Sequence, residues 1–133
     1  MADVKKLREK AAKRGIGTAT GGGGYERHVL VCVGGSCSAK SENEATLKIF
    51  RRRAKVLESQ GHRVYCTPVE CLQLCRGGPL VVIYPEGTWY HSVSPSVAER
   101  IADMHLGQGQ PLEEHVITSN ALHSERNDSA EQN

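Results

Sequence analysis

Four cysteines in two pairs constrain this chain more than any other feature. The first pair is Cys32 and Cys37, in C-V-G-G-S-C, and the second is Cys71 and Cys75, in V-E-C-L-Q-L-C-R-G-G-P. If the second stretch forms one helical turn, its two thiols project from the same face. Soft thiolate ligands in two close pairs are typical of a metal site. A single site needs a fold that joins both pairs across the 33 residues that separate them.

The length and composition indicate one domain of modest size. The chain has 133 residues, of which 38% are hydrophobic, 5% aromatic and 24% charged, and this allows a small aliphatic core. No apolar run approaches the roughly 20 residues of a membrane-spanning helix, and the first ten residues lack the apolar segment of a secretory signal. We therefore expect a soluble, cytoplasmic protein with no membrane partner. In that compartment cysteines bind metals or do redox chemistry more often than they form structural disulfides.

Positive charge is concentrated at the N-terminus. Residues 1–27 carry seven Lys or Arg against three acidic residues, a charge of +4, which leaves −2 for the other 106 residues out of a total of +2. We interpret residues 1–26 as a basic, flexible arm with a Gly-rich linker, although residues 3–14 have helix-forming composition. The alternative is a basic segment that docks on an acidic partner. No dense basic patch with interleaved aromatics indicates a nucleic-acid partner.

The next part of the chain predicts a parallel βαβ unit. The helix begins at a capping box of Ser41 and Glu44 and ends near Gly61, and Pro68 stops the second strand. The basic run Arg51–Lys55 lies mostly off the apolar face, so we interpret it as a solvated surface, with steering of a redox partner as the alternative. The predicted strand, helix and strand cover residues 28–33, 41–61 and 62–67.

The second half predicts a hairpin and another helix. Ser94 caps this helix, and Pro95 occupies its first position. From Gln108 the chain is loop-like, with a short apolar anchor at Val116-Ile117, and we expect residues 119–133 to be a polar, disordered tail. The predicted strands cover 80–84 and 88–91, joined by a turn at 85–87, and the helix covers 94–107.

These elements follow the order β-α-β and then β-β-α. This order is typical of an α/β protein with the thioredoxin-like fold, in which a small mixed sheet carries helices on both faces, and the domain covers residues 27–118. The loop after the first strand and the segment before the third lie at one end of such a sheet. Because these segments hold the four cysteines, we expect the two pairs to converge.

We predict that the four thiolates hold one 2Fe-2S cluster, with one pair on each iron. A cluster with four thiolates is an anion, so nearby groups must offset its charge. Candidates are the backbone N–H groups of the adjacent glycines and one guanidinium. The predicted ligands are Cys32, Cys37, Cys71 and Cys75, and the predicted charge-offsetting residues are Gly34, Gly35, Arg76, Gly77 and Gly78.

Other cysteine chemistries fit the spacing less well. Structural zinc also takes four cysteines, and the x4 and x3 spacings permit it without favouring it. A thioredoxin-type dithiol needs C-x-x-C, which the chain lacks, and a Rieske centre needs two His ligands. The fifth cysteine, Cys66, is interpreted as a small buried hydrophobe, with alternative ligation or a disulfide as lesser possibilities.

Over about residues 27–118 the sequence resembles the thioredoxin-like 2Fe-2S ferredoxins. H-V-L-V-C-V is similar to the first strand of that family, with ligand one, and G-S-C supplies ligand two. T-P-V-E-C-L-Q-L-C supplies ligands three and four. G-P-L-V-V-I-Y-P-E-G-T-W-Y is similar to the hairpin of the family, and L-E-E-H-V-I to its terminal segment. This pattern favours iron–sulfur over zinc.

The resemblance implies a low-potential carrier of one electron that serves redox partner proteins, is often a homodimer and is not an enzyme. The ligand spacing is also similar to that of the peripheral 2Fe-2S subunit of respiratory complex I and of related hydrogenase subunits. That likeness implies an alternative role, as a relay subunit or docking module of a larger oxidoreductase. Pro79 lies where thioredoxin-like folds often place a cis-proline, and the sequence leaves its isomer open.

Overall fold

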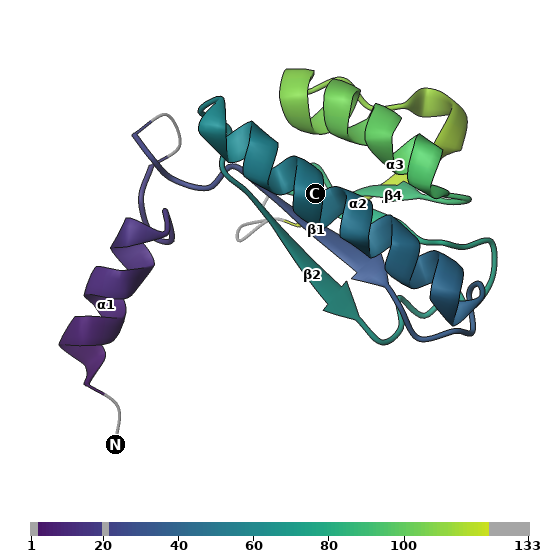
Figure 1. Ribbon diagram of the computed structural model, residues 1–133, viewed down its shortest axis with the longest axis horizontal. Helices are drawn as coiled ribbons and strands as arrows, with labels where there is room; N and C mark the ends of the chain where they lie inside the picture. The colour runs from purple at the N-terminus through teal and green to yellow at the C-terminus, as the bar shows by residue number, and fades with distance from the viewer. Residues whose placement is uncertain (1–2, 20–21, 123–133) are drawn as a thin grey trace, which may run out of the picture.

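The fold is a five-stranded mixed sheet with helices packed against it (Figure 1). The computed structural model describes residues 3–19 and 22–122. The strand order is β2-β1-β3-β4-β5. In chain order the elements are α1 (Val4–Lys13), β1 (Arg27–Cys32), α2 (Lys40–Ser59), β2 (Val64–Val69), β3 (Val81–Tyr84), β4 (Thr88–Tyr90), α3 (Pro95–Ile101), a π-helical segment (Ala102–Leu106), a 3-10 turn (Glu113–His115) and β5 (Val116–Ser119).

The predicted parallel βαβ unit is confirmed, but β2 does not stop at Pro68. Strand β2 runs parallel to β1, and Pro68 lies opposite Val31 in the register. The next residue, Val69, turns its carbonyl toward β1 and accepts the N–H of Val33 at 2.8 Å. Neighbouring residues of a strand alternate in direction, so the nitrogen of Pro68 points to the open edge of the sheet. A proline is tolerated there because no ladder hydrogen bond is lost.

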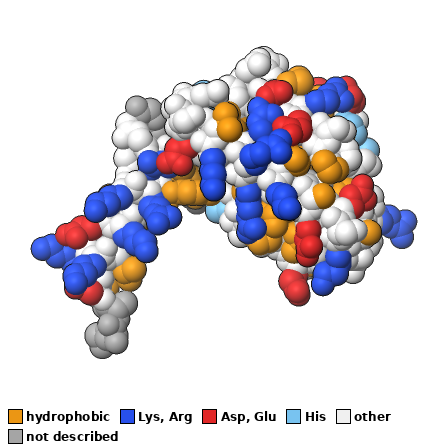
Figure 2. Space-filling view, in the orientation of Figure 1, with side chains coloured by type: hydrophobic (Ala, Val, Ile, Leu, Met, Phe, Trp, Pro, Cys, Tyr) orange, Lys and Arg blue, Asp and Glu red, His pale blue; other side chains and the backbone are white. Residues whose placement is uncertain are grey.

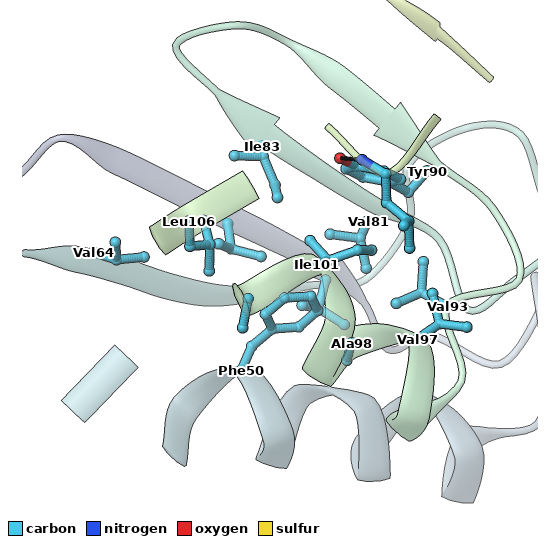
Figure 3. Packing of buried hydrophobic residues seen from close by; sticks show 14 of the residues in the cluster. Phe50, Val64, Val81, Ile83, Tyr90, Val93, Val97, Ala98, Ile101 and Leu106 are labelled. Carbon is cyan, nitrogen blue, oxygen red and sulfur yellow. Dashed lines mark hydrogen bonds between the residues drawn. The ribbon is translucent and has the colours of Figure 1, made fainter. Parts of the chain in front are cut away.

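Helices α2 and α3 pack on the same face of the sheet, so the prediction of helices on both faces was wrong. Side chains of β1 and β3 that point to this face, among them Val29 and Ile83, are fully buried. Phe50 of α2 and Ile101 of α3 pack among them (Figure 3). Arg53 of α2 joins the two helices by an ion pair to Glu99 of α3, with 2.7 Å between Nη1 and Oε1.

The two ends of α2 agree with the sequence to different degrees. The predicted capping box is wrong, because α2 begins at Lys40 and its N-cap, Ala39, has no side chain to accept a hydrogen bond. Ser38 and Glu42 bond to each other instead, with 2.9 Å between Oγ and Oε1. At the other end Gly61 has a φ of +90°, as the predicted left-handed cap requires.

The C-terminal half contains a fifth strand that the sequence did not predict. The cap of α3 is confirmed, since the Ser94 hydroxyl accepts the N–H of Val97 and Pro95 opens the helix. β5 then pairs antiparallel with β4, where only a short apolar anchor was expected. Residues 123–133 of the predicted tail lie outside the described part of the chain, so their disorder stays a prediction.

The basic arm contains helix α1 over most of the segment with helix-forming composition. Its N-cap is Asp3, whose side chain accepts the N–H of Lys6 at 3.2 Å. None of its residues is buried, and Figure 1 shows it standing away from the sheet. Residues 20–21 of the Gly-rich linker lie outside the description, and the predicted flexibility of the arm remains a prediction.

A buried polar chain ties the hairpin to the π-helical segment. The N–H of Leu112 donates to the hydroxyl of Tyr90 at 3.0 Å, so that hydroxyl donates its own proton to Nδ1 of His105, 2.7 Å away. The ring proton of His105 is then on Nε2, which faces Oε1 of Glu86 at 3.4 Å. The other oxygen of Glu86, Oε2, accepts a 2.7 Å hydrogen bond from Arg27. Burial raises the pKa of Tyr90 to about 12.

Because His105 is buried within this polar cluster, we expect acidification to destabilise the fold. Burial lowers the pKa of His105 below its ordinary value of 6.5. Between 6.5 and the lower folded value the unfolded chain binds more protons, so the free energy of unfolding should fall as pH falls through that window. Urea unfolding followed by circular dichroism at a series of pH values measures this slope. His105→Gln should flatten it, and an equal slope in the variant would contradict the assignment.

Within the described residues, no helix is long and apolar enough to cross a membrane.

Candidate metal centre

The sheet brings both cysteine-bearing segments to one end, where β1 and β2 finish. Cys32 is the last residue of β1, and its N–H donates to the carbonyl of Leu80 at 3.0 Å. Val69, which ends β2, lies opposite Cys32 and leads into the second cysteine segment. Leu72 of that segment packs against a small buried cluster made of Cys32, Cys37 and Leu80. The expected convergence of the two segments is therefore present.

The first pair is close and buried. The sulfurs of Cys32 and Cys37 lie 3.1 Å apart, and the two residues are only 2% and 7% exposed. A disulfide would need about 2.05 Å, and all five cysteines are free. Two thiolates on one tetrahedral metal, with bonds of ~2.3 Å, lie about 3.7 Å apart. A small outward movement of either sulfur would therefore fit this pair to one metal ion.

The second pair lies on an irregular loop and is exposed, so the helical turn considered for Cys71 and Cys75 does not form. Two residues of the loop have left-handed backbone, Gln73 with a φ of 75° and Cys75 with a φ of 60°. Such conformations cost of order 1–3 kcal/mol in non-glycine residues and cluster at functional sites. The turn points the N–H of Gln73 at the sulfur of Cys71, 3.2 Å away.

Glycines let the two loops close, while the predicted approach of their N–H groups to the sulfurs of a bound cluster stays a prediction. A Cβ on Gly34 would lie 2.0 Å from the carbonyl oxygen of Glu70, and a Cβ on Gly78 would lie 2.9 Å from the sulfur of Cys37. The N–H of Gly78 donates to the carbonyl oxygen of Cys37 at 2.9 Å rather than to a sulfur. Steric room is thus what these glycines supply. The Gly78–Pro79 bond, left open by the sequence, is cis.

Two residues beside the sulfurs escaped sequence analysis. Gln73 donates a backbone N–H, a role that no side-chain pattern reveals. Asn43 is fully buried in the first turns of α2, and its Oδ1 lies 3.9 Å from the sulfur of Cys37 while its Nδ2 donates to the carbonyl oxygen of Ser38 at 3.3 Å. A buried Asn on the apolar side of a predicted helix was the one available signal.

Two thiols of the site, those of Cys37 and Cys75, have a raised pKa. Burial, followed by hydrogen bonding to Cys32, raises the pKa of Cys37. The neighbouring Cys71 thiol raises the pKa of Cys75, Cys32 contributes from the first pair, and the guanidinium of Arg76 opposes both. The two pairs therefore interact electrostatically, and the positive charge of a bound metal would offset that repulsion and let the thiols deprotonate. Arg76 has the effect on Cys75 expected of a charge-offsetting residue.

Cys66 stands apart from this site. It lies on β2 opposite Val29, three residues before the register position of Cys32. Burial raises the pKa of its thiol to about 12, so it is a protonated, half-buried side chain, in agreement with the interpretation as a small hydrophobe. Among residues 3–19 and 22–122, no three Cys, His, Asp or Glu side chains meet closely enough to hold a single metal ion. The four site cysteines therefore come together as two pairs.

Proteins of known class share both sequence and fold with this chain. A Priestia megaterium protein, named as a candidate 2Fe-2S ferredoxin, is 39% identical over 94 residues, 71% of this chain and 72% of that protein. A 2Fe-2S ferredoxin of Aquifex aeolicus is 33% identical over 100 residues, 69% of this chain and 89% of the relative. No family model matches.

The structural comparison agrees. A crystal structure of the wild-type thioredoxin-like 2Fe-2S ferredoxin from Aquifex aeolicus matches with a TM-score of 0.64 and 30% identity, over 71% of this chain and 98% of that one. These matches agree with the fold, and with the two cysteine pairs at one end of the sheet. Together they define one class of protein. This chain belongs to the thioredoxin-like 2Fe-2S ferredoxins.

Proposed function

We propose that this protein binds a 2Fe-2S cluster through Cys32, Cys37, Cys71 and Cys75 and carries one electron between redox partner proteins in the cytoplasm, without being an enzyme. The observation that carries the proposal is the meeting of a buried, non-disulfide sulfur pair, 3.1 Å apart, with a second pair on the facing loop. The bound cluster supplies one-electron chemistry. It is the resident cofactor that the fold family implies, and the donor set suits it.

The chain's residues divide the work of holding and exposing such a group. Cys32 ends β1, Cys37 lies in the loop between β1 and α2, and both are buried away from water. Cys71 and Cys75 lie at the surface, where the N–H of Gln73 and the charge of Arg76 stabilise thiolate sulfur. Hydrogen bonds and positive charge at the sulfurs raise a reduction potential. Because Cys71 and Cys75 are exposed and the first pair is buried, electrons enter and leave on the side of Cys71 and Cys75.

Paramagnetic resonance of anaerobically purified protein tests the assignment. The protein should be red-brown, silent when oxidised, and give a rhombic signal after dithionite adds one electron per two irons. Metal analysis on the same sample separates the remaining alternatives. A colourless protein with one zinc per chain would sink the proposal and leave a zinc-stabilised interaction module.

Two finer points belong to the same proposal. A homodimer is part of the proposal: the apolar row Leu30, Val82 and Trp89 crosses the sheet on the face opposite α2 and α3, with Val82 buried and the other two partly exposed, and the mass of the holoprotein in solution checks it. The second candidate function is that of a relay subunit in a larger oxidoreductase, because the basic arm could dock on an acidic partner. Co-purification from native cells, with and without residues 1–24, separates it from a free carrier.

A further inference from the structure

A basic surface on α1 and α2 is not used by the cluster site. Figure 2 shows Lys and Arg side chains gathered over both helices on one face of the molecule. On α2, Arg52 and Arg53 are neutralised by ion pairs with Glu99 of α3 and Asp103 of the π-helical segment. Within the described ranges, Lys48, Arg51 and Lys55 form no ion pair. Their charges are therefore available to a ligand.

The three unpaired cations line an open, shallow groove. The groove has a volume of about 490 Å³ and lies between α2 and the edge strand β2. Its floor includes the apolar residues Val64 and Cys66 of β2, and Glu58, the one acidic residue among its lining residues, is paired with Arg63 at 3.4 Å. A concave site with positive walls and an apolar floor suits a protruding acidic segment of a folded protein.

Helix α1 extends this surface. Arg63 donates to the carbonyl of Lys13 at 3.0 Å, and the hydroxyl of Tyr65 donates to the carbonyl of Arg14. Both acceptors are free carbonyls at the C-terminal end of α1, where cations and donors are favourable. Since Tyr65 also lines the groove, α1 is attached beside it. Its exposed Val4 and Leu7, 51% and 54% accessible, offer apolar contact next to the basic side chains.

The groove also lies near the cluster site. Cys66, in its floor, precedes Val69 by three residues, and Val69 pairs with Cys32. At about 3.3 Å per residue of strand, this places the groove about 10 Å from the first ligand. A protein seated there covers the route along β2 to the cysteine loops.

We propose that this groove, together with α1, is the docking surface of an acidic redox protein. The inference rests on the proposed function and specifies the partner by its chemistry. A protein is favoured over a nucleic acid because the groove is short and has an apolar floor. It is favoured over an anionic membrane because the unpaired cations of α2 line a concavity.

Stopped-flow electron transfer from the reduced holoprotein tests the proposal. The acceptors are two ferric haem proteins of opposite charge, acidic cytochrome b5 and basic cytochrome c, each of which takes one electron from one reduced cluster. The groove variant is Arg51→Gln with Lys55→Gln. The matched control is Gln108→Glu with Gln110→Glu, in the exposed loop after the π-helical segment, which changes net charge by the same −2.

At low ionic strength the groove variant should lose about 5–10-fold in the second-order rate constant with cytochrome b5, because steering by a few charges is worth tenfold or more. The control should lose less than about twofold, and added salt should remove the difference. Equal losses in both variants, or none in either, would overturn the proposal. So would groove-dependent sedimentation with phosphatidylserine vesicles without a change in the rate. If dithionite cannot reduce the protein by one electron, the proposed function itself fails, which is a separate result.

Discussion

Replacing Cys71 with serine should alter or abolish the visible absorption of the purified protein. A serine oxygen is a harder and less readily ionised ligand than a thiolate, so it binds iron in a sulfur site less well. Cys71→Ala removes the ligand altogether and should reduce retained iron by more than about tenfold, since even changes outside the ligand shell cost 10–100-fold. Iron content and absorption after anaerobic purification measure both effects.

Cys66→Ser is the matched control for that experiment. It makes the same chemical change on β2, the strand that leads into the loop of Cys71, at a thiol that burial keeps protonated. Its cluster spectrum should equal that of the parent protein. If Cys66→Ser lost the cluster and Cys71→Ser kept it, the ligand assignment would be wrong.

Gly34→Ala should separate folding from cluster binding. The new Cβ would lie 2.0 Å from the carbonyl oxygen of Glu70, so the loop after β1 and the loop after β2 could not close as they do. Backbone displacement of this kind costs about 1–3 kcal/mol. The sheet core lies elsewhere, so far-UV circular dichroism should be retained while iron content falls several-fold.

Gly22→Ala provides the comparison. Its Cβ would come no closer than 3.6 Å to another atom, the carbonyl oxygen of Ala19, and it lies in the arm. Iron content should stay unchanged. A Gly34→Ala protein with full iron content would show that the loops have another way to close, and the steric role assigned to this glycine would be lost.

The sequence predicted the elements whose signals are local. The β-branched run of β1, Gly61 at the end of α2 and the Ser94-Pro95 start of α3 each depend on neighbouring residues, and each was confirmed. The order of these elements was enough to place both cysteine pairs at one end of the sheet. This prediction needed only the rule that a βαβ crossover returns a strand parallel to the first.

The failures concern partners distant in sequence. Val116 and Ile117 were predicted only as a short apolar anchor in a loop-like stretch, and they form β5 because β4 offers a free edge to pair with. The placement of α3 on the same face as α2 follows from packing and from ion pairs such as Arg53 with Glu99, which no periodicity reveals. The capping box failed because the N-cap of α2 is Ala39, two residues before the predicted Ser41.

The candidate site shows the same contrast between local sequence signals and contacts that join distant parts of the chain. Residue types and spacing led to the prediction of four cysteine ligands, which stays a prediction, whereas the contacts around these sulfurs depend on backbone conformation. The left-handed φ of Gln73 and Cys75 replaces the helical turn considered for this segment, and it is this turn that points an amide at Cys71. Gly34 and Gly78 have a steric role because the two loops approach each other within a few ångströms, a fact absent from either loop alone.

Pro68 has a further consequence for how the protein behaves at high concentration. β2 is an outer strand, and outer strands are templates on which other chains can add and aggregate. The nitrogen of Pro68 points to that open side and carries no hydrogen, so an incoming strand finds a missing donor and a ring in its path. The residue that sequence analysis treated as the end of a strand instead protects it against edge-to-edge association.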